Sequence, residues 1–231
     1  MSDWWARPRQ VSVVVDTPGW FDVHAQALAA AATAAGDHAR CVRSHADVGE
    51  GGVAFYLSCL RITPPEVLAR NRLNLVVHAS DLPEGRGFSP LVWQVLAGRN
   101  RIPLCMIEAT EPIDSGAILL RDELVFEGHE LNDEMRERMG QAIVAMCLRL
   151  LACPHVPKGE PQSGEPTWFR RRRPEDSRLD PNASLADQFD LLRVVDNERY
   201  PAFFEHRGHR YVLKIEKAPA AAGEARPGVA A

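Results

Sequence analysis

Residues 73–83 read LNLVVHASDLP. The apolar run with two adjacent valines predicts a buried strand over residues 73–78. This strand leads directly into His78, Ser80 and a turn at Pro83. Ligands of parallel α/β sheets bind beyond the carboxyl ends of the strands, so this junction is a candidate site.

Short apolar runs of the same kind recur along the chain and alternate with helical patterns. Strands are predicted at residues 10–16, 39–42, 53–58, 103–108 and 117–120, and helices at residues 21–35, 64–70, 90–96 and 132–151. Strands that are apolar throughout are typical of a sheet covered on both faces. With the helices between them, they predict an α/β domain with a mainly parallel sheet over residues 10–152.

The chain changes character after this domain. Residues 153–166 are rich in proline, glycine and serine, which predicts a linker. Residues 167–217 are predicted to form a small extension. It contains a helix over residues 184–195 and a hairpin over residues 202–217 that turns at Arg207-Gly208.

The composition is that of an ordinary globular protein. Of 231 residues, 45% are hydrophobic and 25% are charged, and the formal net charge of −4 disfavours a generally basic nucleic-acid binder. The apolar runs are shorter than the roughly 18 residues of a membrane-spanning helix, and residues 1–10 lack the apolar core of a secretory signal. We therefore expect a cytoplasmic protein with neither a nucleic-acid nor a membrane partner. Residues 218–231 are rich in alanine, glycine and proline, and we expect them to be disordered.

The five cysteines indicate a reduced protein. Their number is odd and no CxxC pair is present, which favours buried thiols over a disulfide framework or a zinc ribbon. Cys147, Cys153 and His155 lie close in sequence, but spacing alone is weak evidence for a metal site, and we expect none.

Two polar residues are candidates for acid–base chemistry. His78 follows a buried strand and carries a side chain that titrates near working pH, although a backbone carbonyl alone could satisfy it. Asp114, which precedes Ser115-Gly116, could simply cap a turn. If the two lie at neighbouring strand ends, the carboxylate orients the imidazole and favours its charged form.

These stretches together resemble a known family. The matching motifs are HASDLP at 78–83, GRG at 85–87, Ser89-Pro90, Trp93, Gly98 and IDSGAIL at 113–119. They are similar to the catalytic domain of the 10-formyltetrahydrofolate-dependent formyltransferases, which include enzymes acting on methionyl-tRNA, on glycinamide ribonucleotide and on sugars. The resemblance implies a Rossmann-like fold for residues 10–152. WFRRRRPEDSRLD at 168–180, with Leu192-Arg193 and YPAF at 200–203, resembles the segment that follows this domain in the sugar enzymes.

The resemblance implies a reaction and a set of residues. The reaction is formyl transfer from 10-formyltetrahydrofolate to the amine of a nucleotide-linked amino sugar, by an enzyme that could be a homodimer. His78 would be the base, or once charged the group that stabilises the oxyanion, and Asp114 would hold it. The other implied contacts are Cys59, Leu60, Arg61, Ile62 and Ser80 to the folate, and Arg86, Gly87, Arg193 and Tyr200 to the acceptor. Arg61 could equally be an ordinary exposed charge.

One position departs from the family pattern. The family's catalytic asparagine lies two residues before the histidine, where this chain has Val76. Asn74 is a further two residues back, about 6–7 Å along an ideal strand. It is a candidate catalytic residue. The oxyanion donor would then be protonated His78, a backbone N–H of residues 79–81, a water or Asn74. Val76 also leaves open a catalytically impaired homologue that binds folate or a partner, and a third alternative is formylation of another small amine.

The run Arg170–Arg173 has three possible roles: a solvated loop, a site for the diphosphate of a nucleotide-linked sugar, and a tRNA contact. Residues 174–176 add acid at once, and no RNA-binding motif accompanies the run. The chain is also short for the C-terminal tRNA-binding barrel of methionyl-tRNA formyltransferases. These features favour the first two roles.

Overall fold

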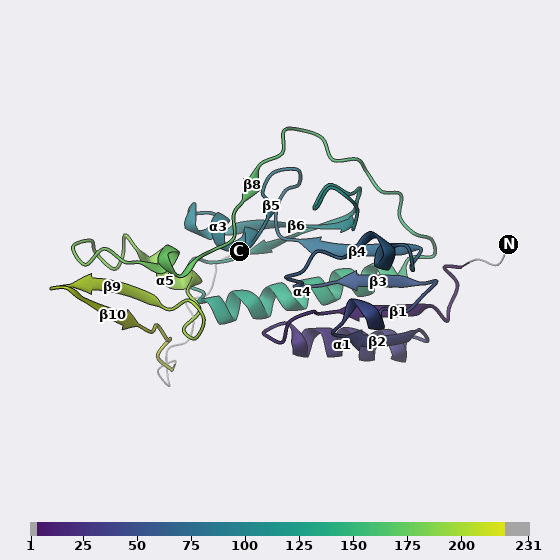
Figure 1. Ribbon diagram of the computed structural model, residues 1–231, viewed down its shortest axis with the longest axis horizontal. Coiled ribbons are helices and arrows are strands. Elements are labelled where there is room, and N and C mark those ends of the chain that lie inside the picture. The colour runs from purple at the N-terminus through teal and green to yellow at the C-terminus, as the bar shows by residue number, and fades with distance from the viewer. Residues whose placement is uncertain (1–3, 220–231) are drawn as a thin grey trace, which may run out of the picture.

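A computed structural model describes residues 4–219 and contains a six-stranded central sheet in the order β2-β1-β3-β4-β6-β7 (Figure 1). Its strands are β1 (Gln10–Val14), β2 (His38–Val42), β3 (Val53–Tyr56), β4 (Leu73–His78), β6 (Arg101–Glu108) and β7 (Ile118–Val125). The first four are parallel, whereas β6 runs antiparallel to both of its neighbours. The predicted mainly parallel α/β sheet is confirmed.

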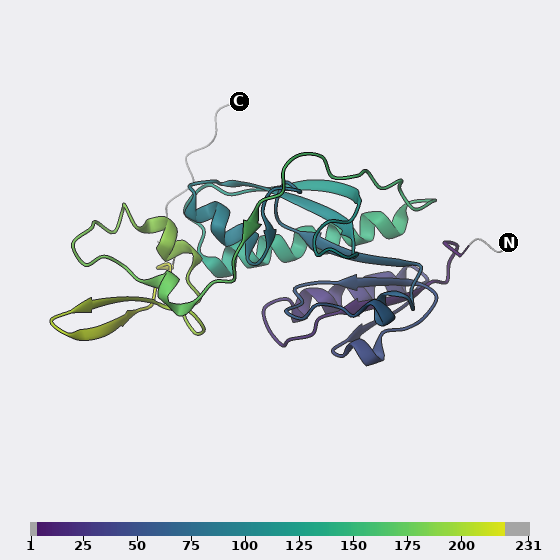
Figure 2. The same cartoon turned by 45° about the horizontal axis from the view of Figure 1, so that its top comes forward.

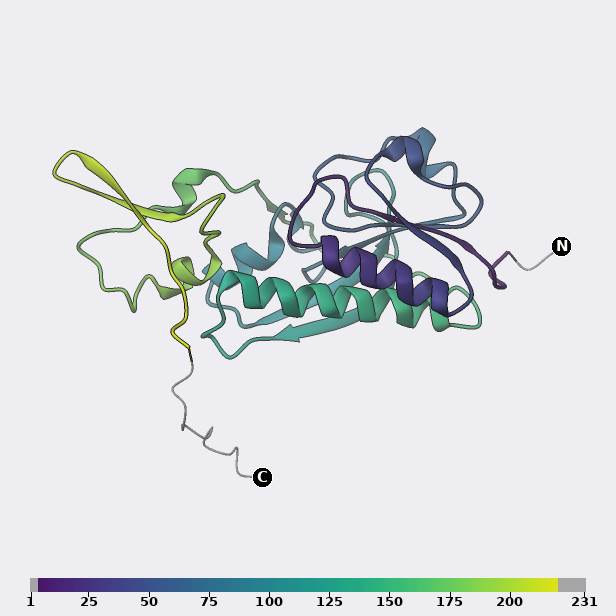
Figure 3. The same ribbon diagram turned by 90° about the horizontal axis from the view of Figure 1, so that it is seen from below.

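Helices cover one face of the sheet. α1 (Asp22–Ala34), α3 (Pro90–Leu96) and α4 (Asn132–Ala152) contribute to a single hydrophobic core with the strands, and Figure 3 shows α1 and α4 side by side. On α4, apolar residues that recur at intervals of three and four form a stripe that faces inward: Met135, Ile143, Met146 and Leu150 are buried. The methionines of this stripe are core residues, as their helical spacing predicts.

The other face is covered by short elements and loops. α2 (Pro65–Leu68) and the 3-10 helix η1 (His45–Asp47) flank a smaller cluster that includes Tyr56 and Val67. A third cluster joins Leu82 to Ile107 and Ile118.

A buried ion pair fixes the start of β1. Arg9 donates to both carboxylate oxygens of Asp37, at 2.9 and 2.7 Å, and the two side chains are almost completely buried. Burial alone would raise the pKa of Asp37, but the hydrogen bonds from Arg9 lower it overall.

The chain after α4 crosses back over the sheet (Figures 1 and 2). On its way it forms two backbone hydrogen bonds between Glu160 and Ile118. It then forms β8 (Trp168–Phe169), which pairs in parallel with β5 (Arg86–Gly87). Residues 153–166 are therefore attached to the domain at the edge strand β7, and the predicted linker boundaries stay a prediction.

The C-terminal extension contains η2 (Pro174–Ser177), α5 (Phe189–Val194), β9 (Ala202–His206) and β10 (His209–Leu213). The hairpin turns at Arg207-Gly208, where both residues have positive φ, +50° and +81°, as a type I′ turn requires. The predicted helix over 184–195 is wrong at its start. Gln188 accepts from the Asp180 N–H and donates to nearby carbonyls, which holds the preceding residues in turns. Of the expected disordered tail, residues 220–231 lie outside the described residues.

All five cysteines are free thiols, but only Cys105 and Cys147 are buried, and Cys41 is exposed. The expectation of buried thiols therefore holds for Cys105 and Cys147 and is wrong for Cys41. Burial raises the pKa of the Cys59 thiol to about 12. Between residues 4 and 219, no helix has the length and apolarity that crossing a bilayer requires.

Candidate functional site

His78 ends β4 and is buried with both ring nitrogens facing polar groups. Its Nε2 lies 2.8 Å from the carbonyl oxygen of Gly85, which can only accept, so Nε2 carries the proton. Its Nδ1 lies 3.8 Å from Oδ1 of Asp114. A backbone carbonyl therefore satisfies one ring nitrogen, and a carboxylate faces the other; the acid–base role of His78 stays a prediction.

Asp114 reaches His78 by a route that the sequence did not predict. β6 is antiparallel to β4, with Glu108 paired to Leu75, so the carboxyl ends of the two strands lie at opposite ends of the sheet. The expectation of neighbouring strand ends is wrong for this pair. Instead, the loop between β6 and β7 folds back and carries Asp114 to His78, with Asp114 in the left-handed region at φ +54°.

A glycine loop holds both members of the pair. The Gly85 carbonyl accepts from His78, and the Gly87 N–H donates to Oδ2 of Asp114 at 2.9 Å. Both glycines have positive φ, and a Cβ on Gly87 would lie 2.4 Å from the carbonyl oxygen of Phe169. Only glycine therefore fits between Asp114 and β8 at position 87.

Gln162 and Thr167, which both follow α4 in the chain, contact this loop, and sequence reasoning missed both. Gln162 donates to the carbonyls of Asp114 and Gly116, at 2.8 and 2.9 Å, and accepts from Arg86 at 2.6 Å. Thr167 Oγ1 accepts from the Gly85 N–H at 2.8 Å. Both lie in or beside a stretch whose composition indicates only a linker, so the sequence carried no signal for them.

The loop after β3, predicted to bind the folate, is fixed by a carboxylate at the end of β1. Asp16 accepts from the backbone N–H groups of Leu60 and Arg61 at 2.7 to 3.0 Å. The Leu60 and Ile62 side chains are exposed, and the Cys59 thiol donates to the Val14 carbonyl. Asp16 was another missed residue, although its place directly after an apolar strand is a usable signal.

Ser80 lies in the loop that follows β4. Its hydroxyl oxygen is buried and has no hydrogen-bond partner among the described residues. An unpaired buried hydroxyl is costly, so this position suits a water or a ligand group.

Asn74 is not brought to the imidazole. Its amide donates to the carbonyls of Leu68 and Asn71, at 2.8 and 3.4 Å, and accepts from the Tyr56 hydroxyl. These contacts attach β4 to the end of α2. Val76 contacts two of the apolar clusters, so no side-chain amide stands two residues before His78.

The predicted acceptor residues divide into two groups. Arg86 and Gly87 line the site. Arg193 lies elsewhere: its guanidinium is 1% exposed and binds Glu130, Asn100 and Asp190. Tyr200 belongs to the extension, where its carbonyl accepts from Ser177. A substrate role for Arg193 and Tyr200 stays a prediction.

The arginine run does not form one basic patch. Arg170 lies over the ring of Trp93 and pairs with Asp176, and its hydrogen bond is the main reason that the pKa of Asp176 falls to about 2. Arg171 lies over Phe88, and Arg172 is buried against the Val194 carbonyl and Ser177. Arg170, Arg171 and Arg172 are thus all engaged in contacts within the fold.

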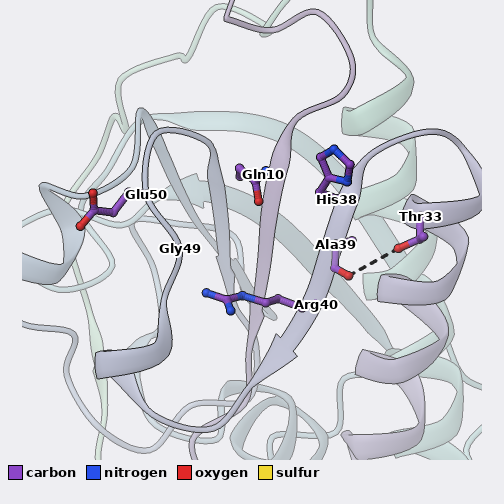
Figure 4. A pocket seen from close by; sticks show the side chains of 7 residues that line it. All are labelled: Gln10, Thr33, His38, Ala39, Arg40, Gly49 and Glu50. Atoms are coloured by element: carbon purple, nitrogen blue, oxygen red, sulfur yellow. Dashed lines mark hydrogen bonds between the residues drawn. The ribbon is translucent and has the colours of Figure 1, made fainter.

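A hollow of about 500 Å³ lies at the start of β1 and β2 (Figure 4), whereas His78 stands at the opposite, carboxyl end of the parallel strands. The hollow is lined by Gln10, Thr33, His38, Ala39, Arg40, Gly49 and Glu50. None of these belongs to the predicted site, and we give the hollow no role. Among residues 4–219, no group of three or more His, Cys, Asp or Glu side chains is placed to hold a metal ion.

Known proteins similar to this chain include methionyl-tRNA formyltransferases. No family model matches the chain. Over 169 residues it is 28% identical to the methionyl-tRNA formyltransferase of Acidiphilium cryptum, and the match covers 73% of this chain and 55% of that protein. The chain thus spans just over half the length of the curated relatives it matches.

Solved structures share the fold. The methionyl-tRNA formyltransferase of Clostridium thermocellum superposes with a TM-score of 0.77 at 24% identity, over 94% of this chain and 95% of that one. HypX of Aquifex aeolicus in complex with tetrahydrofolic acid gives 0.69 at 14%, over 90% and 38%. A sugar N-formyltransferase of Shewanella gives 0.61 at 15%, over 92% and 99%. These likenesses show that the chain shares the fold of the methionyl-tRNA formyltransferase and the sugar N-formyltransferase.

Proposed function

We propose that this chain transfers a formyl group from 10-formyltetrahydrofolate to the amine of a nucleotide-linked amino sugar. The observation that carries the proposal is the His78–Asp114 pair, held from both sides by the Gly85–Gly87 loop. Nε2–H is occupied by the Gly85 carbonyl, so Nδ1 is the nitrogen that can take a proton. Asp114 Oδ1, 3.8 Å away, then faces the imidazolium.

These residues divide the work of the reaction. His78 Nδ1 takes the proton that the acceptor amine loses as its nitrogen bonds to the formyl carbon. The bond from that carbon to N10 of the donor breaks, and the proton is returned to N10. Protonated His78 offsets the negative charge that gathers on the formyl oxygen, which is the task of the amide absent at position 76.

The surroundings fit a folate donor and an amine acceptor. Exposed Leu60 and Ile62 stand on a loop held by Asp16, and apolar side chains of this kind suit a flat ring. The buried unpaired hydroxyl of Ser80 offers a polar contact beside His78. HypX, whose structure carries tetrahydrofolic acid, supports a folate-derived donor through the shared fold.

Two acceptors are compared. The curated relatives favour methionyl-tRNA. A nucleotide-linked sugar is favoured by the helix-and-hairpin extension and by an arginine run that is partly buried. The overlap with solved structures is near-complete for the methionyl-tRNA enzyme and for the sugar enzyme alike, so it does not separate the two acceptors. The acidic residues that follow the run also disfavour a long polyanion.

The test is tetrahydrofolate release from 10-formyltetrahydrofolate in the presence of each acceptor. A panel of nucleotide-linked amino sugars is compared with initiator methionyl-tRNA and with free amino sugars. Release that depends on a nucleotide-linked sugar supports the proposal. Release only with the tRNA would assign the other acceptor, and donor binding without release would favour the impaired homologue.

A further inference from the structure

Few contacts fix the geometry of the His78–Asp114 pair. The chain after α4 holds the two loops that make these contacts. Asp114 stands in a loop at a positive φ, and among residues 4–219 its carboxylate accepts a hydrogen bond from one backbone N–H, that of Gly87. The pair's separation of 3.8 Å is longer than a hydrogen bond, so it does not hold itself together.

Gln162 bridges the two loops of the site. Its Nε2 donates to the carbonyls of Asp114 and Gly116, and its Oε1 accepts from Arg86, the residue between the two glycines that bind His78 and Asp114. The Gln162 side chain therefore fixes both the backbone of Asp114 and the loop that carries the Gly87 N–H. Gly116 itself is tightly seated, because a Cβ there would lie 1.9 Å from the Glu108 carbonyl oxygen.

Thr167 completes the attachment on the other side. Its Oγ1 accepts from the Gly85 N–H, and its carbonyl accepts from the Arg86 N–H at 2.9 Å. Thr167 thus holds Gly85, whose carbonyl accepts a hydrogen bond from His78. Gly87, which donates to Asp114, is linked to Gln162 through Arg86. Both contacts come from about 80 residues further along the chain.

We propose that Gln162 is a positioning residue for this reaction, and that it sets the orientation of Asp114 toward His78. The inference rests on the proposed function. Gln162 touches no reacting atom; it acts through the carbonyls of Asp114 and Gly116. The segment after α4 is therefore part of the site.

The substitution Gln162→Glu isolates this role. It keeps the shape of the side chain and an oxygen for Arg86, but it removes both donors to the Asp114 loop. Ser163→Ala, in the same exposed segment, and Gln141→Glu, on the surface of α4, are the matched controls. We expect kcat of Gln162→Glu to fall about 10- to 100-fold with little change in KM, as misplacement of a catalytic group predicts. The controls retain wild-type kcat, and thermal unfolding shows all three variants folded.

A second readout needs no turnover. In amide hydrogen exchange, Gln162→Glu speeds exchange of the Gly87 N–H, which is bonded to Asp114, and leaves the Gly85 N–H protected. Thr167→Val does the reverse. Unchanged Gly87 exchange, or a loss of kcat that only follows loss of folded protein, would overturn the proposal. If the wild type transfers no formyl group to any acceptor, the proposed function fails, and the exchange experiment still decides whether Gln162 positions Asp114.

Discussion

Nδ1 of His78 faces Oδ1 of Asp114 at 3.8 Å, while the opposite nitrogen of the ring is bonded to a backbone carbonyl. This arrangement fixes the tautomer and leaves one nitrogen for proton transfer. Protonation of that nitrogen would place a second N–H toward the carboxylate and shorten the contact.

His78→Asn and Asp114→Asn should each reduce turnover by about 10²–10⁴-fold, because general acid–base help is lost. Asparagine at 114 keeps an oxygen for the Gly87 N–H, so the loop should survive. The measurement is steady-state kinetics beside circular dichroism of each variant. Near-normal turnover in a folded His78→Asn protein would remove His78 from the reaction.

Asn74→Ala should change turnover by less than about tenfold, below 1.4 kcal/mol, because the Asn74 amide is bonded to Leu68 and Asn71. It should instead lower the free energy of unfolding by about 0.5–1.5 kcal/mol, the net contribution of hydrogen bonds between part-buried groups. Urea unfolding and kinetics separate the two effects. A thousandfold loss of turnover in a folded variant would identify Asn74 as the displaced family asparagine.

Gly87→Ala should lower turnover more than tenfold, because its Cβ would meet the Phe169 carbonyl and displace the N–H that holds Asp114. Gly98→Ala is the matched control. It also has positive φ, +78°, but meets no atom within 4 Å, so only backbone strain of about 1–3 kcal/mol is expected there. Equal turnover in the two variants would contradict the placement of the glycine loop.

Asp37→Ala should lower the free energy of unfolding by about 3–5 kcal/mol, because it leaves Arg9 buried and unpaired. Asp122→Ala removes the exposed pair with Arg149 and should cost less than about 1 kcal/mol. Since the pKa of Asp37 is lowered on folding, its contribution is present above the unfolded value of about 3.9 and is lost as the pH falls through the folded one. Urea unfolding from neutral to acidic pH should show the difference between wild type and Asp37→Ala shrinking; a constant difference would count against the ion pair.

The strands, the long helix and the hairpin turn were predictable from the sequence because each depends on a local pattern of residues. Apolar β-branched runs predict β1, β3 and β4, and Arg207-Gly208 supplies the positive φ of a type I′ turn. The antiparallel direction of β6 was not predictable in this way. Strand direction depends on where the chain re-enters the sheet, and the apolar pattern of residues 101–108 is the same for either direction.

The site was predictable where a residue directly follows a strand, as His78 does. Asp114 was identified by family likeness, and its path to His78 depends on a loop conformation that composition does not encode. Gln162 and Thr167 were missed because their contacts are with residues 46 to 82 positions away in sequence, which leaves no local pattern.

The most direct measurement follows the formyl carbon itself. The protein is incubated with 10-formyltetrahydrofolate labelled with ¹³C in the formyl group and a nucleotide-linked amino sugar, and the product is examined by mass spectrometry. The proposed function predicts a labelled formamide on the sugar amine with the wild type and none above background with folded His78→Asn. A wild-type protein that binds the donor but labels no amine, or a His78→Asn variant that labels the sugar at the wild-type rate, would contradict it.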